Sequence, residues 1–383
     1  MAHHRATRAE INLKAFKHNI ENLKKILGSD VGIMSVIKAD AYGHGAVPCS
    51  KAALECGVSY LGAGIIEEGI ELRKNGITEP ILILGGIFLN EAADLVHYDL
   101  TTILSTPTLA DELSNQGNKQ GKIVKVHIKV DTGMNRLGVR PEDLLNLIEK
   151  IKTLPNLNLE ALSTHFSSAD DEDSSITKNQ IELFQKALLE LKKSGIHPPI
   201  THLANSSALF RFPDSRGKIV RPGLILYGAL PSPILNPIVK KLCKKDKLDD
   251  FQPVMQWKSK IIQLKLTPKG EALSYSRRYF TQKESLIATL PIGYADGLNR
   301  NLSNKMQVLI KGKLAPQVGN ICMDMILIDV SRIPDVKLGE DVVIFGKQGD
   351  KQISVEELAD KSGTIPYELF CNVSKRVPRI YQN

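Results

Sequence analysis

The feature that most constrains the fold is an alternation of two kinds of segment over the first two-thirds of the chain. Short apolar runs rich in Val, Ile and Leu are followed by stretches whose apolar residues recur at helical spacing. The apolar runs lie at residues 31–38, 60–64, 81–84, 101–104, 124–130, 159–163, 200–203 and 224–227, and helix-like stretches lie at 51–56, 67–75, 141–151 and 177–193. Strands that alternate with helices in this way form a parallel sheet.

The number of predicted strands points to a barrel. About eight strands within roughly 230 residues match a (β/α)8 TIM barrel, which typically needs about 250 residues. An open, doubly wound sheet is the structural alternative, but its usual nucleotide-binding fingerprint, G-x-G-x-x-G after the first strand, is missing. We therefore predict an α/β fold with an N-terminal (β/α)8 TIM barrel.

A C-terminal, mainly β domain is predicted for the last third of the chain. Strand-like segments at 256–266, 285–292, 306–310, 325–330 and 341–345 are punctuated by Gly and Pro, with one late helix at 355–362. The boundary is expected in the Lys/Asp-rich stretch 239–250, which has the composition of a solvated loop. We place the barrel at 12–240 and the β-rich domain at 250–383, with residues 1–11 as candidates to pack against it.

Composition and charge argue against several classes of protein. The net charge of +8 raises the question of nucleic-acid binding, but the basic residues are spread along the chain, and their densest run, 240–247, lacks interleaved aromatics. The five cysteines form no CxxC pair, which argues against a disulfide framework or a zinc knuckle. No apolar run approaches the ~20 residues of a membrane helix, and the first residues lack the apolar core of a signal peptide. We expect a cytoplasmic protein that binds neither nucleic acid nor membrane.

The candidate chemistry begins where the first predicted strand ends, at Lys38. Active sites of barrels lie at the C-terminal ends of the strands. Partial burial would lower the pKa of such a lysine from about 10.4 and free its amine to form a Schiff base. A lysine that is ion-paired, or that extends to solvent, is the alternative interpretation.

Two later loops offer a phosphate site. The loops after the seventh and eighth strands of barrels often bind phosphate, and here they contain residues 203–207 and 221–224. The first supplies a hydroxyl and amides at a helix start, and the second contains Gly223, which lets the backbone come close to a ligand. A helix cap and a turn would explain each loop alone. Together with Lys38, however, they form the layout that pyridoxal phosphate (PLP) requires, with its aldehyde at one end and its phosphate at the other.

Several motifs carry a resemblance to a known family. The segment Val36-Ile37-Lys38-Ala39-Asp40-Ala41-Tyr42-Gly43-His44-Gly45 resembles the PLP-attachment signature of the alanine racemases. The likeness continues at 127–138, 164–166, 205–206, 220–223, 274–275, 291–297, 322–324 and 364–368. Each motif alone is moderately specific, but the set is highly specific, since it spans nearly the whole chain in the family's order. The resemblance implies an isomerase that interconverts L- and D-alanine and supplies D-alanine for bacterial peptidoglycan.

The resemblance also implies how the cofactor is held. Lys38 would bind PLP, His165 would lie against the pyridine ring, and Arg221 would hydrogen-bond the ring nitrogen. The remaining cofactor-binding residues would be Tyr42, Asn205, Ser206, Gly223, Leu224 and Tyr367. Because arginine stays protonated, the ring nitrogen should remain largely unprotonated, which weakens the ring as an electron sink. The substrate carbanion should then be reprotonated at Cα rather than on the cofactor.

Racemisation needs a proton-transferring group on each face of Cα. By the resemblance, Lys38 would serve the D-alanine face and Tyr275 the L-alanine face. A phenol, with a pKa of about 10, needs cationic or hydrogen-bonding neighbours to act as a base. In the family this tyrosine comes from the partner subunit, so the resemblance implies a head-to-tail homodimer with two shared sites.

Substrate contacts and supporting residues follow from the same resemblance. Arg136 and the backbone N–H of Met323 would contact the substrate carboxylate, and Tyr294 would narrow the entrance. Asp324 would support this loop. Strand alternation places His127 and Lys129 on one face, both candidates to point inward, and we expect Lys129 to be carbamylated so that it pairs with Arg136. A plain lysine beside a bound anion is the alternative.

Two departures from the family pattern concern the loop of the second base. Ser276 stands where the family usually has Gly, and Asn320 stands where Arg is common. Neither touches a proposed catalytic role, but both leave the shape of the Tyr275 loop and the tolerance for other substrates open.

Four other functions fit the sequence less well than this one. A PLP-binding homeostasis protein would share the barrel but lack the β domain, and a metal-dependent barrel hydrolase would usually show His-x-His after the first strand. A racemase of broader specificity often works outside the cytoplasm, and no export signal is visible. A decarboxylase of related plan would lack the second base, Tyr275.

Overall fold

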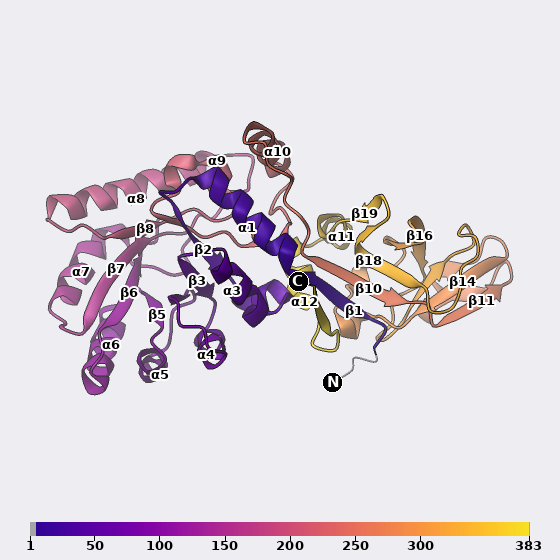
Figure 1. Ribbon diagram of the computed structural model, residues 1–383, viewed down its shortest axis with the longest axis horizontal. Helices are drawn as coiled ribbons and strands as arrows, with labels where there is room; N and C mark the ends of the chain where they lie inside the picture. Colours follow the sequence, from indigo (N-terminus) through magenta and orange to yellow (C-terminus); the bar gives the residue numbers. More distant parts are fainter. Residues whose placement is uncertain (1–4, 383) are drawn as a thin grey trace.

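The structure, a computed structural model, describes residues 5–382 and consists of a barrel and a β-rich part that extends from it (Figure 1). The barrel contains an eight-stranded parallel sheet, and the second part is built on a ten-stranded sheet that is mostly antiparallel. The α/β fold with a TIM barrel and a C-terminal β domain is therefore confirmed. Residues 1–11 are predicted to pack against the C-terminal domain, and residues 1–4 of this segment lie outside the described residues.

The barrel strands follow one another in chain order around the sheet. They are β2 (Gly32–Val36), β3 (Tyr60–Ala63), β4 (Ile81–Ile83), β5 (Thr101–Leu104), β6 (Val124–Lys129), β7 (Leu157–Ser163), β8 (Ile200–His202) and β9 (Ile219–Val220), the last pairing with β2. Backbone hydrogen bonds from Lys218 N to Thr201 O (2.8 Å) and from Arg221 N to Ala204 O (2.9 Å) join β9 to the β8 segment and close the barrel.

The helices of the barrel lie outside this sheet (Figure 1). They are α1 (Leu13–Leu27), α3 (Ala46–Glu55), α4 (Ile66–Lys74), α5 (Ala92–His97), α6 (Pro107–Gln120), α7 (Leu144–Lys152), α8 (Ser175–Lys193), α9 (Ala208–Arg211) and α10 (Leu235–Lys245). Their apolar spacing explains the packing: in α7, for example, Leu144, Leu147, Ile148 and Ile151 are buried along one side.

The second part is a long twisted sheet that incorporates both ends of the described chain. Its strands are β1 (Arg8–Asn12), β10 (Met255–Lys260), β11 (Gln263–Thr267), β14 (Ser285–Leu290), β15 (Gln307–Ile310), β16 (Lys313–Val318), β17 (Ile326–Asp329), β18 (Asp341–Gln348), β19 (Lys351–Ile353) and β20 (Arg379–Gln382), beside the small hairpin of β12 (Ala272–Leu273) and β13 (Tyr279–Phe280). The first strand, β1, lies between β10 and β20, so the chain begins in this sheet before it enters the barrel.

Two helices complete the second part. The helix predicted at 355–362 is confirmed as α11 (Val355–Ser362), where the Ser354 side chain accepts from Glu357 N. A second helix, α12 (Pro366–Asn372), was not predicted from the sequence. It packs against α2 (Lys38–Gly43), and so joins the second part to the barrel at the C-terminal ends of the barrel strands.

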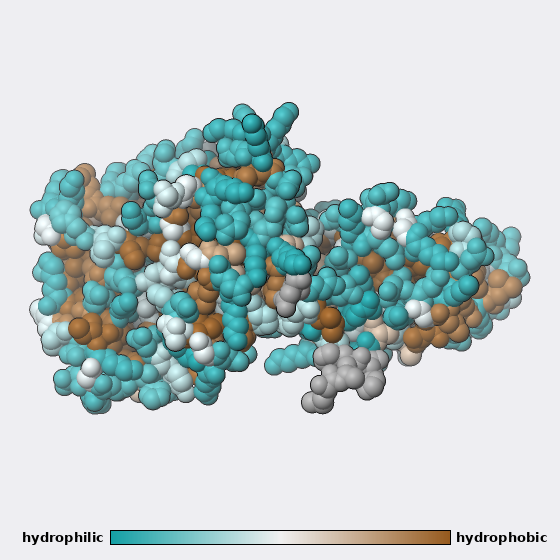
Figure 2. All heavy atoms as spheres, viewed as in Figure 1, coloured by the Kyte–Doolittle hydropathy of each residue, from teal (hydrophilic) through white to brown (hydrophobic). Residues whose placement is uncertain are grey.

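Three predictions of local structure were wrong. The eighth barrel strand is β9, and the run Leu224–Tyr227 forms a buried 3-10 turn, η4, because four consecutive apolar residues fit a buried strand or a buried helical turn equally well. The stretch 256–266 is two strands rather than one. Most of the lysine run at 239–250 lies in α10 rather than in a loop: Leu235, Val239 and Cys243 are buried along one side, and the outer side is hydrophilic (Figure 2).

The described residues contain no helix that is both long enough and apolar enough to cross a membrane.

Candidate active site

A cavity of about 730 Å³ opens at the C-terminal ends of the barrel strands. Nine of the residues singled out from the sequence line it: Lys38, Tyr42, Lys129, Arg136, His165, Asn205, Ser206, Arg221 and Gly223. Tyr367 joins them from α12, outside the barrel. The structure therefore brings together residues separated by more than 300 positions in the chain.

Lys38 begins an unusual turn directly after β2. Residues 39–42 all have left-handed backbone angles, with φ between 51° and 53°. Such a conformation costs an L-residue roughly 1–2 kcal/mol, so a run of four needs support from its surroundings. His44 supplies part of it, because its buried Nδ1 lies 3.0 Å from Ala41 O and 2.9 Å from Tyr42 O and donates to these carbonyls.

Glu68, in the first turn of α4, anchors the same turn from the other side. Its Oε1 accepts from Ala39 N and its Oε2 from Gly64 N, each at 2.6 Å. One carboxylate thus ties the residue after Lys38 to the end of β3 and fixes the direction in which Lys38 leaves the backbone.

The loops after β8 and β9 form a polar cradle. Asn205 Oδ1 accepts from Ser207 N (3.1 Å) and Ala208 N (3.0 Å), which shapes the first loop. The buried Ser206 Oγ accepts from Gly223 N at 2.9 Å and so joins the two loops. At Gly223, a Cβ would lie 2.5 Å from the phenolic oxygen of Tyr42, so glycine is required for this approach.

Two further residues complete this end of the cavity. The rings of Tyr42 and Tyr367 lie 5.6 Å apart between centroids. Burial raises the pKa of both phenols above the usual 10, so each remains a neutral hydrogen-bond donor. Leu224 does not line the cavity; it is buried at the start of η4, directly after Gly223.

The opposite end of the cavity is cationic. Arg221 is buried, and its Nη2 lies 3.1 Å from His165 Nδ1. Burial lowers the pKa of Arg221 to about 10, which still leaves it charged at neutral pH. Burial and then the charge of Arg221 hold the pKa of His165 well below 6.5, so this imidazole is neutral.

Two lysines in the cavity have lowered pKa values. For Lys38, burial and then the charge of Arg136 lower the pKa. For Lys129, which is buried near the end of β6, burial followed by the charges of Arg221 and Arg136 lowers the pKa to about 8. Both amines are therefore more available as bases or nucleophiles at neutral pH than a surface lysine is.

Three other predicted residues of the C-terminal part do not line this cavity. Tyr275, Met323 and Tyr294 are instead exposed, by 72%, 53% and 42% of their surface. Tyr294 N donates to Cys322 O at 3.0 Å and Ala295 N to Met323 O at 3.0 Å, so two of the exposed loops lie side by side.

Asp324 lies in the same exposed region, where it pairs with Arg376. Its Oδ1 accepts from Arg376 Nη2 at 2.6 Å, and Arg376 also pairs with the buried Asp296 at 3.6 Å. This places Asp324, which directly follows Met323 in the chain, in an exposed ion-pair network.

The loop that carries Tyr275 combines strained backbone with specific anchors. Ser274 (φ 65°, ψ −174°) and Ser276 (φ 62°, ψ 10°) have positive φ, the first in a region that is occupied almost entirely by glycine. Ser274 Oγ donates to Asn320 O at 2.7 Å, and Asn320 Nδ2 donates to Tyr275 O at 2.8 Å. Asn320, noted from the sequence as a departure, therefore fixes the backbone of Tyr275 directly.

Sequence reasoning missed several residues that hold the site together. Glu68 and His44 act on backbone groups, and no motif at the level of spacing identifies such contacts. His202 contacts Arg221, and Glu160 contacts His127, both from inside the barrel. The inward alternation of β6 pointed to His127, but the partners of His127 depend on the register of β6 with β7 and β8, which the sequence does not specify.

Comparison with known proteins gives matches over nearly the whole chain. A family model described as "Alanine racemase, N-terminal domain" matches residues 11–231, and one described as "Alanine racemase, C-terminal domain" matches residues 254–381. The alanine racemase of Halothermothrix orenii is 45% identical over 380 residues, covering 99% of this chain and 97% of that protein.

Solved structures of similar proteins share the complete fold. The alanine racemase of Clostridium difficile 630 is 38% identical with a TM-score of 0.92, covering 100% of this chain and 97% of that one. The alanine racemase of Bacillus anthracis with bound L-Ala-P is 36% identical with a TM-score of 0.91, covering 100% of this chain and 96% of that one.

Proposed function

This chain belongs to the alanine racemase family, and we propose how its own residues carry out that family's reaction. It is a PLP-dependent isomerase that interconverts L- and D-alanine, which places it in the supply of D-alanine for peptidoglycan. The observation that carries the assignment of roles is the cavity in which Lys38 faces a polar cradle and a buried arginine.

The cavity fits PLP. The phosphate would be held at the end of the cavity lined by Tyr42, Asn205, Ser206, Gly223 and Tyr367, with the backbone N–H of Leu224 contributed from directly after Gly223. Hydroxyls and backbone amides are the usual donors to phosphate. His165 would lie against the ring, and Arg221 would hydrogen-bond the ring nitrogen. When bound, PLP supplies an electron-accepting ring that makes the Cα proton of an attached amino acid acidic.

Lys38 would bind the cofactor and then serve as the base on the D-alanine face of Cα. Its lowered pKa favours the unprotonated amine that both tasks require. The Glu68 anchor and the left-handed turn after β2 fix where this amine begins. Because Arg221 is a donor only, it would leave the ring nitrogen unprotonated and favour return of the proton to Cα.

Tyr275 would act on the L-alanine face. In one protomer this side chain is exposed and lies outside the cavity, so we propose that Tyr275 of the partner subunit completes the site. A head-to-tail homodimer with two shared sites follows from this arrangement, since each chain would contribute a lysine to one site and a tyrosine to the other.

Substrate recognition would use groups from both parts of the chain. Arg136 lines the cavity and would bind the substrate carboxylate together with the backbone N–H of Met323 of the partner subunit. Tyr294 of the partner subunit would narrow the entrance and exclude side chains larger than methyl, with Asp324 of the partner subunit supporting the loop.

Lys129 is proposed to be carbamylated. An amine whose pKa is lowered to about 8 is partly unprotonated at neutral pH and can add carbon dioxide, releasing one proton as the N–C bond forms. The anionic carbamate would replace a repulsion between Lys129 and Arg136 with a charge-assisted pair.

Two broader assignments complete the proposal. We place the functional units at residues 12–240 and 250–383, with the first strand contributed to the second unit, and we place the enzyme in the cytoplasm. The alternating strand–helix pattern of the first unit and the reduced state expected for five cysteines without a CxxC pair support these assignments.

A paired measurement on purified protein tests the proposal. The visible absorbance of the bound cofactor is recorded first, and conversion of L-alanine is then compared with conversion of L-serine and L-lysine. We expect a cofactor band, a strong preference for alanine, and loss of both signals in Lys38→Ala. A band without conversion of any amino acid would contradict the role of Tyr275, and the lack of any band after PLP is added would contradict the role of Lys38.

A further inference from the structure

A line of hydrogen bonds runs through the barrel interior, from the active-site cavity toward the opposite end. Arg221 Nη1 lies 2.6 Å from His202 Nδ1, and His202 Nε2 lies 2.9 Å from His127 Nδ1. His127 Nε2 then lies 3.0 Å from Glu160 Oε2. His202, His127 and Glu160 come from the adjacent strands β8, β6 and β7, so the line is part of the barrel framework.

The groups at the two ends of this line determine which atom donates and which accepts in each of its hydrogen bonds. Arginine can only donate, so His202 Nδ1 must accept. Burial holds the pKa of His202 and of His127 below 6.5, so both rings are neutral and carry one proton each. His202 therefore donates from Nε2, His127 accepts at Nδ1 and donates from Nε2, and Glu160 accepts.

Arg221 has no closer negative partner. Within residues 5–382 its hydrogen bonds go to the carbonyls of Thr164, His202 and Leu203 and to histidine rings, and none goes to a carboxylate. A buried charge normally requires a compensating charge or a full set of polarised donors and acceptors. The imidazoles of His202 and His127 connect Arg221 to a compensating charge, because each ring transmits the polarisation from Arg221 at one end of the line to Glu160 at the other.

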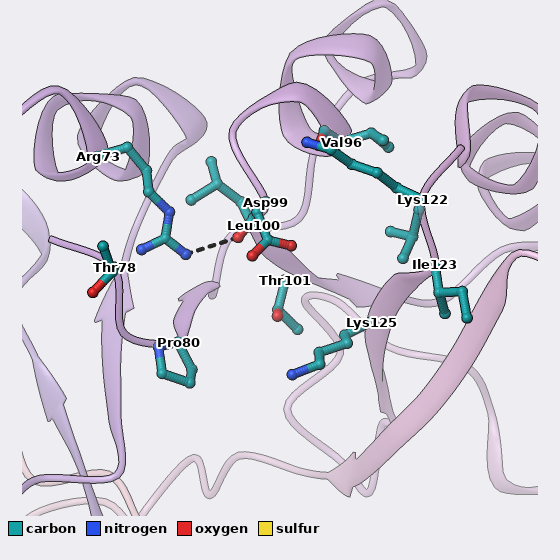
Figure 3. Close-up of a pocket in the computed structure, with 11 residues that line it drawn as sticks. Arg73, Thr78, Pro80, Val96, Asp99, Leu100, Thr101, Lys122, Ile123 and Lys125 are labelled. Carbon is teal, nitrogen blue, oxygen red and sulfur yellow. Dashed lines mark hydrogen bonds between the residues drawn. The ribbon is translucent and has the colours of Figure 1, made fainter. Parts of the chain in front are cut away.

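Glu160 is itself held as a carboxylate. Burial would raise its pKa, but hydrogen bonds from His127 and from Tyr60 outweigh this and lower the pKa to about 2. Lys125 Nζ lies 3.4 Å from Glu160 Oε1. Lys125 also lines a pocket of about 120 Å³, where it lies on the side across from Arg73 (Figure 3). The line from Arg221 therefore ends in a charged group close to solvent.

We propose that Glu160 is a positioning residue for the racemase, acting as the counter-charge of Arg221 through His127 and His202. This rests on the proposed role of Arg221 at the ring nitrogen. Glu160 keeps His202 an acceptor toward Arg221, fixes the orientation of the guanidinium, and moderates the positive potential at the cofactor ring, although it touches neither cofactor nor substrate.

The proton assignment is tested in the wild-type holoenzyme labelled with ¹⁵N in its histidine rings. Long-range ¹H–¹⁵N spectra distinguish the two neutral tautomers and the imidazolium. We expect His127 and His202 both to be neutral with the proton on Nε2. A proton on Nδ1 of His202, or a charged ring at neutral pH, would overturn the proposal without bearing on whether the enzyme racemises alanine.

The role of the charge is tested with Glu160→Gln, whose side-chain oxygen can still accept from His127. The matched control is Glu10→Gln, which removes a similarly buried, ion-paired carboxylate (12% side-chain exposure against 14% for Glu160) from β1 in the other sheet. We expect kcat for alanine to fall about tenfold with KM changed less than about twofold, which separates a defect in the reacting complex from one in substrate binding. The pH midpoint of the cofactor absorbance should fall by roughly half a unit, because a negative charge has been removed from the interior.

A milder variant guards against misfolding. Tyr60→Phe removes one donor to Glu160 but leaves its negative charge and the line of hydrogen bonds intact, so the absorbance midpoint should not fall as it does in Glu160→Gln, and KM should be unchanged. If Glu160→Gln matches Glu10→Gln in kcat and in absorbance midpoint while the wild type racemises alanine, Glu160 has no role in the site and the proposal fails.

Discussion

The two halves of the proposed site are built on different principles. The barrel half is complete within one chain: Lys38, Ser206 and Arg221 project from the ends of adjacent parallel strands, and buried hydrogen bonds fix Ser206 and Arg221. The C-terminal half consists of exposed loops, where Tyr275 and Met323 lie on the surface of a single protomer.

This difference shows how each half of the site positions its side chains. Strand ends position side chains without special backbone conformations, apart from the turn after Lys38. The Tyr275 loop instead relies on positive φ at Ser274 and Ser276 and on two hydrogen bonds to Asn320. The barrel half is therefore preformed within one chain, whereas the proposed role of the loop half requires a second chain.

The largest expected effect tests whether the halves come from different chains. Lys38→Ala and Tyr275→Phe should each lower turnover by at least about 10²–10⁴-fold, since each removes a proton-transferring group. When the two inactive variants are unfolded together and refolded as a mixture, about a quarter of wild-type activity should return, because half of the dimers are mixed and each has one intact site. Racemisation of L-alanine is the measurement.

Controls make this outcome specific. Each variant refolded alone should stay inactive, and the Tyr275→Phe protein should keep the cofactor absorbance that Lys38→Ala lacks. A mixture that remains as inactive as its components, although dimers form, would show that both bases belong to one chain and would remove the basis for a shared site.

Much of the fold could be predicted because its determinants are local. Apolar runs separated by helical spacing gave most barrel strands and helices, and the helix at 355–362 was placed to the residue. The run 224–227 was misassigned because burial on all sides removes the periodicity that separates strand from helix. The loop predicted at 239–250 was wrong because Leu235, Val239 and Cys243 recur at helical spacing and bury one side of α10, while the lysines occupy its outer side.

The sequence predicted some residues of the candidate site but not the residues that hold them in place. Motif residues such as Lys38 and Gly223 were identified from their places at the ends of predicted strands and from the family resemblance, and they meet in one cavity. Residues that act on backbone or on other side chains, such as Glu68 and Glu160, were not identified. Their partners lie on neighbouring strands or helices, and only the register of the sheet brings them together.

A second prediction concerns charge in the barrel half, at Lys129. As a free amine, it has a folded pKa of about 8, below the unfolded value of about 10.5, so it opposes folding below pH 8 and this penalty disappears as the pH rises toward 10.5. In buffer free of carbon dioxide, Lys129→Met should therefore be more stable than wild type at pH 7 by about 1–3 kcal/mol. Urea unfolding at several pH values measures this.

Carbon dioxide should reverse the sign of that difference. If Lys129 is carbamylated, its negative charge lies near two arginines, and wild type in bicarbonate should become the more stable protein, while Lys129→Met does not respond. A wild-type protein whose stability is indifferent to bicarbonate would refute the carbamate and leave the plain lysine as the correct description.

A third, smaller effect tests the cradle. Ser206→Ala removes the oxygen that accepts from Gly223 N, which leaves a buried N–H without its partner and loosens the two phosphate-binding loops. The dissociation constant for PLP should rise about five- to tenfold, equivalent to about 1 kcal/mol. The control is Ser207→Ala, a neighbouring buried serine whose backbone rather than hydroxyl is tied to Asn205. Equal losses in both variants would mean that general packing, rather than this hydrogen bond, sets the affinity.

The smallest predicted effect concerns the exposed half, at Ser276. A left-handed conformation costs serine roughly 1–2 kcal/mol, whereas glycine adopts it freely but loses more entropy on folding. Ser276→Gly should therefore stabilise the protein by no more than about 1 kcal/mol, measured by urea unfolding, and kcat should change less than about twofold.

The Tyr275 loop offers a matched test of strain against anchoring. Asn320→Ala removes the hydrogen bond to Tyr275 O without changing a backbone angle, so it should lower kcat several-fold while leaving cofactor absorbance intact. If Ser276→Gly lowers kcat as much as Asn320→Ala does, then the strained conformation itself holds Tyr275 in place. The barrel half already depends on left-handed backbone in the turn after Lys38. In that case the loop half would depend on it as well, and the two halves would differ only in how far their side chains are exposed.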